Sequence, residues 1–236
     1  GTNLQNAETV TRAISQRIAE FRRGEQASNT ETVVEKELAV AKLSLLHAQV
    51  EPHFLYNTLG SAKYLIASDP GKAEAMLDNL ILYLRHSLPR DADAPSTLGD
   101  EIVRTRAYLD ILKIRMDERL QVSIDLPDEL AAVPFPTMML QTLAENAINH
   151  GLEPKTGGGR IWITARKDID GDSITVTVAD DGIGFGGDTS GTGIGLKNIR
   201  ERLKLAYGSA ANFTIIANFP EGVAASINVP LAGPAA

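Results

Sequence analysis

The sequence contains no cysteine, only one tryptophan and no long apolar run. The lack of cysteine excludes a disulfide framework, a thiolate metal site and a cysteine nucleophile. No apolar stretch approaches the roughly 18–20 residues that a membrane-spanning helix needs, and no signal-peptide pattern opens the chain. Basic residues (23) are outnumbered by acidic ones (30), which gives a formal net charge of −7. This acidic balance argues against a general nucleic-acid binder, so we expect no nucleic-acid partner.

The chain nevertheless has enough apolar material for a core, since 43% of its 236 residues are hydrophobic. Up to about Arg119 glycine is scarce and the sequence is rich in good helix formers, whereas from Gln121 onward glycine and alternating β-branched residues increase. We therefore predict an α+β protein in three parts. These are a helical linker over 1–35, a pair of helices within 36–95, and an α/β domain with its leading helix over 96–236.

The pair of helices within 36–95 has broad apolar faces on both members. In the second helix, Pro70 suits the first helical position and Asp69 can cap it. Two such helices cannot cover each other fully, so we predict that two copies of the chain form a dimeric four-helix bundle. Thr97 and Asp100 have the spacing of a capping box and predict a further helix to about Glu118.

The α/β part alternates strand-like and helix-like segments. We predict strands over 121–126, 160–166 and 173–179, helices over 136–150 and 194–207, and a closing hairpin that pairs 213–218 with 223–229. The strands outnumber the helices that could connect parallel strands, which predicts a mixed sheet with helices on one face.

A histidine next to a proline is the most unusual local feature of the helical part. Pro52 lies inside an apparent helical pattern, where it removes one backbone hydrogen bond and predicts a kink. His53 follows, and Gln49 and Asn57 lie one helical turn away on either side, so the three polar side chains share one stripe. A neutral imidazole is a competent nucleophile near neutral pH. The alternative is an ordinary histidine on a helix surface.

The α/β part lacks both common phosphate-binding patterns, the P-loop and the Rossmann glycine motif. Three other segments occur in its place. The first is 145–151, at the end of the predicted helix, where Asn146, Asn149 and His150 lie on neighbouring parts of the surface. Such groups could meet a hydrated cation and phosphates, as Mg²⁺ favours few protein ligands. An ordinary polar helix end is the alternative.

The second segment, 180–184, directly follows a strand. The carboxylate of Asp180 could accept a hydrogen bond from an exocyclic amine such as that of adenine, while Gly182 and Gly184 would let a flat base approach the backbone. A plain Asp-Gly turn is the alternative.

The third segment, 191–198, is rich in glycine and opens a helix. Gly193 and Gly195 would present backbone N–H groups to phosphate, and Lys197 could add positive charge. One glycine-rich loop is weak evidence, but the three segments in this order, each in its strand–loop–helix context, strongly indicate a nucleotide site.

With these residues, the chain resembles the cytoplasmic transmitter of sensor histidine kinases of the LytS type, over about 38–231. The segment 49–57 is similar to that family's phosphoacceptor box, which implies phosphorylation of His53. The other three segments match the N box (145–151), the G1 box (180–184) and the G2 box (191–198) of the ATP-binding fold that gyrase B, Hsp90, histidine kinases and MutL share.

The resemblance implies both a reaction and its partners. ATP with Mg²⁺ would bind in the α/β domain, with Asn146 on the metal, Asp180 on the adenine amine, and Gly193 and Gly195 beside the phosphates. Autophosphorylation would be followed by transfer to an aspartate of a response regulator, and Asn57 would serve a reverse, phosphatase reaction. The resemblance further implies a homodimer in the cytoplasm whose full-length form is tethered to the bacterial inner membrane.

One departure from the wider ATPase pattern bears on the reaction. In the ATP-hydrolysing relatives a glutamate precedes the magnesium asparagine by one helical turn, but here that position is Thr142. Glu145 is turned ~100° around the helix and does not replace it. This difference favours transfer to a protein nucleophile. The alternatives are an ATPase that acts as a conformational switch and a non-catalytic dimeric ATP-binding module.

Overall fold

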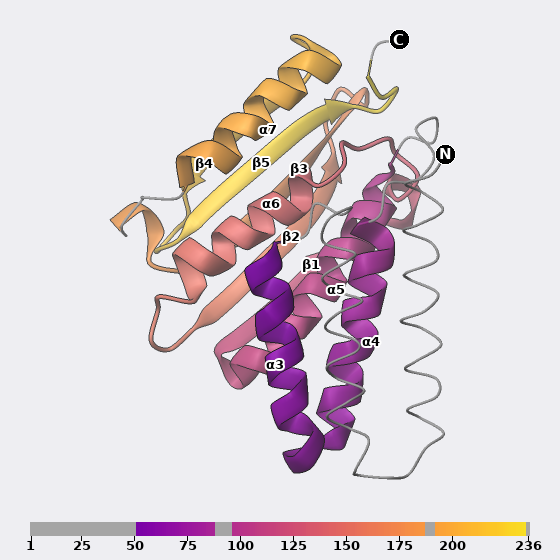
Figure 1. Ribbon diagram of the computed structural model, residues 1–236. Coiled ribbons are helices and arrows are strands. Elements are labelled where there is room, and N and C mark those ends of the chain that lie inside the picture. The colour runs from indigo at the N-terminus through magenta and orange to yellow at the C-terminus, as the bar shows by residue number, and fades with distance from the viewer. Residues whose placement is uncertain (1–50, 88–95, 187–191, 235–236) are drawn as a thin grey trace. The chain divides into compact units, whose positions relative to one another are not determined.

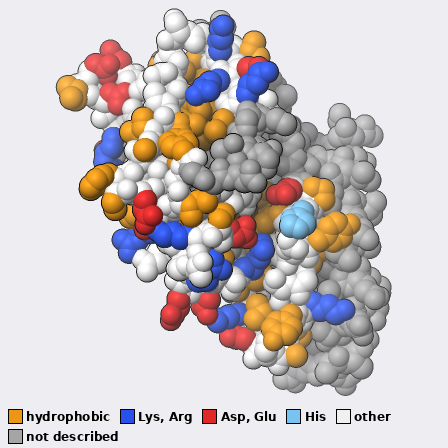
Figure 2. Space-filling view, turned by 90° about the vertical axis from the view of Figure 1, so that its left-hand side faces the viewer, with side chains coloured by type: hydrophobic (Ala, Val, Ile, Leu, Met, Phe, Trp, Pro, Cys, Tyr) orange, Lys and Arg blue, Asp and Glu red, His pale blue; other side chains and the backbone are white. Residues whose placement is uncertain are grey.

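The computed structural model describes residues 51–87, 96–186 and 192–234, and it divides the chain into two compact units, 1–94 and 95–236. The predicted linker over 1–35 and Gln49 lie outside the described residues. None of the helices in the described ranges is both long and apolar enough to cross a membrane. On the described part of the face in Figure 2, acidic and basic side chains are interspersed.

The helical unit contains an antiparallel pair, α3 (Pro52–Ser68) and α4 (Pro70–Ser87) (Figure 1). The two helices pack through buried apolar side chains, and the rings of Phe54 and Tyr83 meet edge to face with centroids 5.4 Å apart. Between the helices, the carboxylate of Asp69 accepts a hydrogen bond from the N–H of Lys72 at 3.1 Å. The cap that the sequence predicts at Asp69 and Pro70 is therefore present.

The predicted kink at Pro52 is wrong. Glu51 has an extended backbone (φ −64°, ψ 120°), and α3 begins at Pro52 instead of running through it. Proline suits this first helical position, because its missing N–H would have no intrahelical partner there. His53 consequently lies in the first turn of a helix, and its side chain is exposed.

The second unit is built on one mixed sheet of five strands in the order β1-β2-β3-β5-β4, which confirms the predicted mixed sheet. β1 and β2 are parallel, and the other neighbouring pairs are antiparallel. The strands are β1 (Leu120–Asp125), β2 (Gly159–Lys167), β3 (Ser173–Asp180), β4 (Asn212–Ala217) and β5 (Val223–Pro230). The predicted closing hairpin is present as β4 and β5, with Phe213 opposite Ile227.

Three helices cover one face of this sheet (Figure 1): α5 (Leu98–Met116), α6 (Met139–Asn146) and α7 (Thr192–Tyr207). In β3, side chains alternate between buried residues on the helix side and half-buried ones on the other side, as expected for a sheet covered on one face. At the start of α5 the predicted capping box is formed, with Thr97 and Asp100 bonding each other's backbone N–H groups. Short turns complete the unit: η2 (Asp117–Arg119), η3 (Asp128–Leu130), η4 (Ala147–Leu152) and η5 (Gly184–Gly186).

The carboxylate of Asp168, the first residue of the turn between β2 and β3, fastens one end of the sheet. Asp168 accepts hydrogen bonds from the hydroxyls of Ser173 (2.5 Å) and Thr175 (2.9 Å) and from the side-chain amide of Asn228 (2.5 Å). These donors come from β3 and β5, so one side chain ties three strands together. The hydrogen bonds, that from Ser173 first, hold the pKa of Asp168 below its ordinary value.

Replacing Asp168 with asparagine is expected to destabilise the second unit by about 1–2 kcal/mol at neutral pH, because charge-assisted hydrogen bonds are lost. A lowered pKa contributes stability above the pKa of the unfolded chain, and this contribution disappears as the pH falls through the folded-state pKa. Urea unfolding of wild type and Asp168→Asn should therefore differ at pH 7 and converge in acid. A difference that stayed constant with pH would contradict this role for the charge.

Candidate functional site

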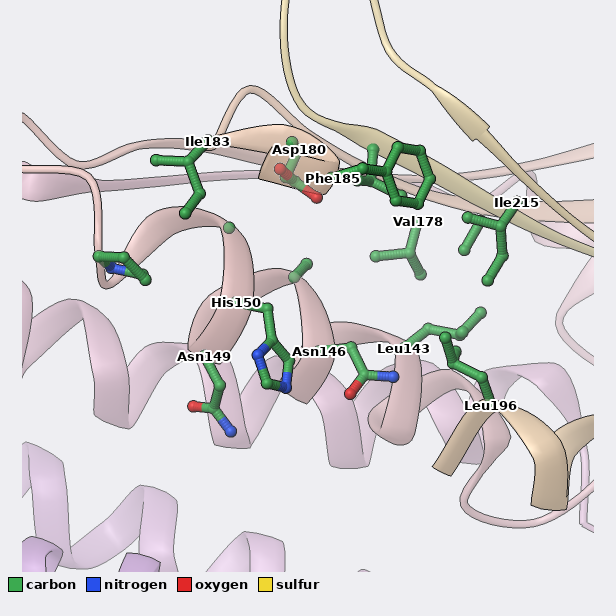
Figure 3. A pocket seen from close by; sticks show the side chains of 16 residues that line it. Leu143, Asn146, Asn149, His150, Val178, Asp180, Ile183, Phe185, Leu196 and Ile215 are labelled. Atoms are coloured by element: carbon green, nitrogen blue, oxygen red, sulfur yellow. The ribbon is translucent and has the colours of Figure 1, made fainter. Parts of the chain in front are cut away.

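A cavity of about 300 Å³ opens in the second unit between α6, η4 and the ends of the strands. Figure 3 shows Asp180 on one side of it and the polar side chains of Asn146, Asn149 and His150 along the opposite side. Most of the remaining wall is apolar. It is formed by side chains from the helices, the strands and the turn after β3, namely Leu143, Ala147, Pro154, Val178, Ile183, Phe185, Leu196, Ile215, Val223 and Ala225.

Asp180 ends β3 with its side chain only 3% exposed. One carboxylate oxygen, Oδ1, accepts the N–H of Gly182 at 2.8 Å, and the side-chain amide of Asn218 donates to the Asp180 carbonyl at 2.8 Å. Burial raises the pKa of this carboxyl to about 6, while the N–H groups of Gly182 and Val223 oppose the shift. A buried carboxylate that borders a cavity is suited to a ligand that donates a hydrogen bond.

Glycines let three backbone segments converge around this carboxylate. A Cβ atom on Gly151 would lie 2.7 Å from Oδ1 of Asp180, and one on Gly182 would lie 2.3 Å from the backbone of Gly151. Gly222 has a positive φ of 101°, and a Cβ there would lie 1.9 Å from the Asp180 carbonyl oxygen. The N–H of Ile183 donates to the Gly151 carbonyl at 3.0 Å, which joins the N box to the G1 box.

The N box does not continue α6 as a regular helix. Residues Ala147–Leu152 form a π-helical turn, in which the N–H of Glu153 reaches the carbonyl of Ile148. Each residue of this wider turn advances by less than the ~100° of an α-helix, so the angular positions expected from an α-helix shift. Asn146 and His150 are half-buried and Asn149 is exposed, although all three border the cavity.

The side-chain amide of Asn146 is the group that best fits a bound cation and phosphate. Its Nδ2 atom is buried and has no hydrogen-bond partner among the described residues, which is costly unless a ligand supplies one. Since amide oxygen and nitrogen positions are interchangeable, the same group can offer an oxygen to a metal ion. The described residues contain no group of three or more acidic or histidine side chains that could hold a metal. The donor set therefore suits Mg²⁺ only together with phosphate and water.

The structure brings part of the G2 box to the same place. A Cβ on Gly195 would lie 3.4 Å from the methyl group of Thr142 and 4.0 Å from Nδ2 of Asn146. The hydroxyl of Thr142 donates to the Met138 carbonyl at 2.7 Å, so this side chain is engaged within its own helix. Thr142 has no carboxylate, and its hydroxyl donates to the backbone, so this side chain is not suited to act as a general base.

The remaining predicted site residues have different surroundings. Gly193 lies in the first turn of α7, and Gly184, with φ of 70°, borders the cavity. Gly182 is buried beneath the turn and does not line the cavity. Lys197 is 73% exposed and lies 3.8 Å from Glu201 along the helix, and it is not among the residues that line the cavity.

Sequence reasoning missed the residues that close the edge of the site. The ammonium group of Lys155 donates to the carbonyl of Asp181 at 2.5 Å and to Glu221 at 2.8 Å, which links the turn after η4 to the G1 box and to the β4–β5 turn. It also missed the apolar walls, including Phe185, which is 58% exposed. The alternation in β3 and β5 was the available signal for the walls, whereas no sequence signal indicates Lys155.

His53 and Asn57 lie in the helical unit, one turn apart on α3. The Asn57 amide nitrogen is 3.3 Å from both ring nitrogens of His53. Because these two distances are equal, the Asn57 amide nitrogen lies over the face of the His53 ring and not along the lone pair of either ring nitrogen. The amide thus lies against the ring without occupying either nitrogen's in-plane acceptor direction.

Two family models match the chain. "Histidine kinase" covers residues 41–120, and "Histidine kinase-, DNA gyrase B-, and HSP90-like ATPase" covers residues 133–233.

Individual relatives agree with these models. The chain is 38% identical to "Sensor histidine kinase YesM" of Bacillus subtilis over 84% of this chain and 35% of the relative. It is 36% identical to "Sensor histidine kinase BtsS" of Escherichia coli over 72% of this chain and 30% of the relative. It is 30% identical to "Sensor protein LytS" of Streptococcus agalactiae over 82% of this chain and 35% of the relative. The chain thus spans about a third of the length of these relatives.

Proposed function

The chain belongs to the sensor histidine kinases of the LytS, YesM and BtsS type, and on this premise we propose that it uses ATP to phosphorylate His53. The phosphoryl group would then pass to an aspartate of a response regulator. One observation carries the proposal: the cavity that Asp180 borders is also lined by Asn146, whose Nδ2 atom has no hydrogen-bond partner within the described part of the chain. A base-binding carboxylate and a phosphate-side amide are what a nucleotide needs at its two ends.

Adenine would bind at the Asp180 end of the cavity. Each carboxylate oxygen can accept more than one hydrogen bond, so Asp180 could accept from the exocyclic amine in addition to the Gly182 N–H. Apolar side chains such as Ile183 and Val178 offer surfaces for the flat base. Because Gly151 and Gly182 have no Cβ atoms, the backbone can pack closely around the buried carboxylate of Asp180.

The phosphates would lie towards Asn146 and the start of α7. Asn146 is the residue that would hold Mg²⁺, with Asn149 and His150 on the same border of the cavity. Mg²⁺ supplies charge neutralisation for the transferring phosphoryl group. The N–H groups of Gly193 and Gly195, at a helix N-terminus, would add favourable dipoles, and Lys197 would contribute longer-range positive charge.

The exposed imidazole of His53 would be the nucleophile. One ring nitrogen attacks the γ-phosphorus, a nitrogen–phosphorus bond forms, and the bond to the bridging oxygen breaks as ADP leaves. Catalysis consists mainly of positioning and charge stabilisation. The hydroxyl of Thr142 donates to a backbone carbonyl instead of activating water, which favours this transfer over hydrolysis.

We further propose that two copies of the chain pair through their helices as a four-helix bundle, with 36–95 as the dimerisation and phosphotransfer part and 96–236 as the ATP-binding part. Two helices with broad apolar faces support this pairing. The full-length protein would be tethered to the bacterial inner membrane, with this region in the cytoplasm.

A labelling experiment tests the function directly. Incubation with ATP labelled on the γ-phosphate and Mg²⁺ should give a labelled protein whose adduct is labile in acid and stable in alkali, as expected for phosphohistidine. Steady phosphate release without a labelled protein would instead support an ATPase switch. Nucleotide binding with neither product would support a non-catalytic ATP-binding module.

Asn57→Ala is expected to separate two activities of the kinase. Asn57 lies over the His53 ring and is placed to orient water for removal of phosphate from the regulator. We expect dephosphorylation of a phosphorylated regulator to fall by ~10-fold or more, since positioning is lost, while labelling of His53 changes much less. The opposite pattern, slow labelling with normal dephosphorylation, would contradict this role.

A further inference from the structure

A lysine at the edge of the cavity joins the segments that surround Asp180. Lys155 lies in the turn after η4, directly after Pro154, which lines the cavity. Its ammonium group donates to the carbonyl oxygen of Asp181 at 2.5 Å and to a carboxylate oxygen of Glu221 at 2.8 Å. One side chain therefore connects the turn after η4, the segment after β3 and the β4–β5 turn.

The backbone of Lys155 is held in place as well as its side chain. The Nη2 atom of Arg119 donates to the carbonyls of Glu153 (3.2 Å) and Lys155 (3.1 Å). The N–H of Gly158 donates to the same Lys155 carbonyl at 2.8 Å. An exposed ion pair usually contributes little, because ordering two long side chains costs entropy. Here the turn that carries the lysine is already fixed, so fewer groups remain to be ordered.

Both segments that the ammonium group contacts also meet the backbone of Asp180. Asp181 follows Asp180 directly in the chain. In the β4–β5 turn, Gly222 packs so closely that a Cβ there would lie 1.9 Å from the Asp180 carbonyl oxygen. The side-chain amide of Asn218, before this turn, donates to the same oxygen at 2.8 Å. The position of the Asp180 carboxylate therefore depends on two segments that Lys155 ties to each other.

We propose that Lys155 is a positioning residue for adenine recognition, which fixes the Asp180 carboxylate at the place where the exocyclic amine of ATP binds. This inference rests on the proposed function for its ligand, whereas the contacts of Lys155 are present without any ligand. Lys155 is not among the residues that line the cavity, so it acts through Asp180 and not on the base itself. Its loss should weaken the binding of a nucleotide that has the amine more than that of one without it.

Three variants separate the contacts of Lys155 from its charge. Lys155→Met removes both contacts, and Glu221→Gln removes the charged partner while the bond to Asp181 remains. Lys167→Met is the matched control. It removes the same charge from an exposed lysine at the end of β2, whereas Asp180 pairs with the other end of that strand.

Two quantities are measured in the full chain. The first is hydrogen exchange, without nucleotide, of the Ile183 and Asn218 N–H groups, which donate to the carbonyls of Gly151 (3.0 Å) and Gly222 (3.0 Å). The second is the dissociation constant for ATP and for purine riboside triphosphate, whose base lacks the exocyclic amine. In Lys155→Met we expect about 5-fold faster exchange at both positions and about 10-fold weaker ATP binding, with the other nucleotide weakened by no more than about 2-fold.

Glu221→Gln should give smaller changes in the same direction, and Lys167→Met should match the wild type in both measurements. Wild-type exchange in Lys155→Met, or an equal loss of affinity for both nucleotides, would overturn the inference. Changes of the same size in Lys167→Met would attribute the result to net charge and would overturn it too. A wild type that binds both nucleotides equally would contradict the proposed contact between Asp180 and adenine, and the exchange data would still decide whether Lys155 holds the two segments.

Discussion

Replacing His53 with glutamine is expected to abolish the acid-labile phosphoryl adduct completely. Glutamine preserves polarity and approximate length but has no nucleophilic ring nitrogen, so no substitute chemistry remains at this position. Because His53 is exposed in the first turn of α3, the variant should fold with a stability within ~0.5 kcal/mol of the wild type. Labelling with γ-labelled ATP, together with nucleotide binding and circular dichroism, measures these quantities.

His86 provides the matched control, since it is a second described histidine of the same helical unit. It lies in the last turn of α4, and His86→Gln should retain labelling. Persistent label on His53→Gln, with the adduct still labile in acid, would show that another residue accepts the phosphoryl group. Loss of nucleotide binding in His53→Gln would indicate a damaged protein instead of a missing nucleophile.

Asp180→Asn is expected to weaken ATP binding by about 100-fold, or ~2.7 kcal/mol, and at the same time to stabilise the protein without nucleotide. Asparagine has one acceptor oxygen for the Gly182 and Val223 N–H groups, and its NH₂ group is a donor where the carboxylate would accept from the adenine amine. Two donors would then face each other. Without nucleotide the substitution removes a buried charge, and we expect a gain of about 1–3 kcal/mol at pH 7.

The sign of the pH dependence follows from the raised pKa of Asp180. Its ordinary value of 3.8 applies to the unfolded chain, and burial raises the folded value to about 6. The folded protein therefore holds this proton more tightly, and wild-type stability decreases as the pH rises from about 3.8 through about 6. The stability advantage of Asp180→Asn should be largest above pH 6 and should vanish below pH 4. Thermal unfolding across this range measures it.

ATP binding should show the opposite trend, since the ionised carboxylate is the better acceptor. Below about pH 6 the affinity of the wild type for ATP should fall. The affinity of Asp180→Asn should change with pH only as far as the phosphates of ATP titrate. Asp181→Asn is the control. This neighbouring carboxylate accepts the Arg160 N–H at 2.7 Å and does not line the cavity. Equal affinity losses in the two variants would contradict a specific contact between Asp180 and adenine.

The features that could be predicted from the sequence are those with local causes. The capping box of Thr97 and Asp100 depends on residues three apart, and the strand before Asp180 depends on a period of two, so both are visible in the sequence. The order of the three glycine-rich and polar segments predicted the ATP-binding domain that the family model matches, because each segment carries its own turn or helix end.

The features that sequence reasoning missed depend on residues that are distant in the chain. The contact at the edge of the cavity joins Lys155 to Glu221, 66 positions later in the sequence. The residues that flank Lys155 and Glu221 in the sequence give no indication of this contact. The error at Pro52 has a different cause, because proline is compatible with both the inside of a kinked helix and its first position, and only the backbone of Glu51 distinguishes them.

Because Ala147–Leu152 form a π-helical turn, the number of residues in this turn determines the geometry of the site. A substitution at Asn149 changes one side chain at the border of the cavity. The loss or gain of a single residue would instead shift the Gly151 carbonyl away from the Ile183 N–H and move the backbone beside Asp180. Insertions and deletions in these six residues should therefore be far rarer among functional members of the family than substitutions at its exposed positions.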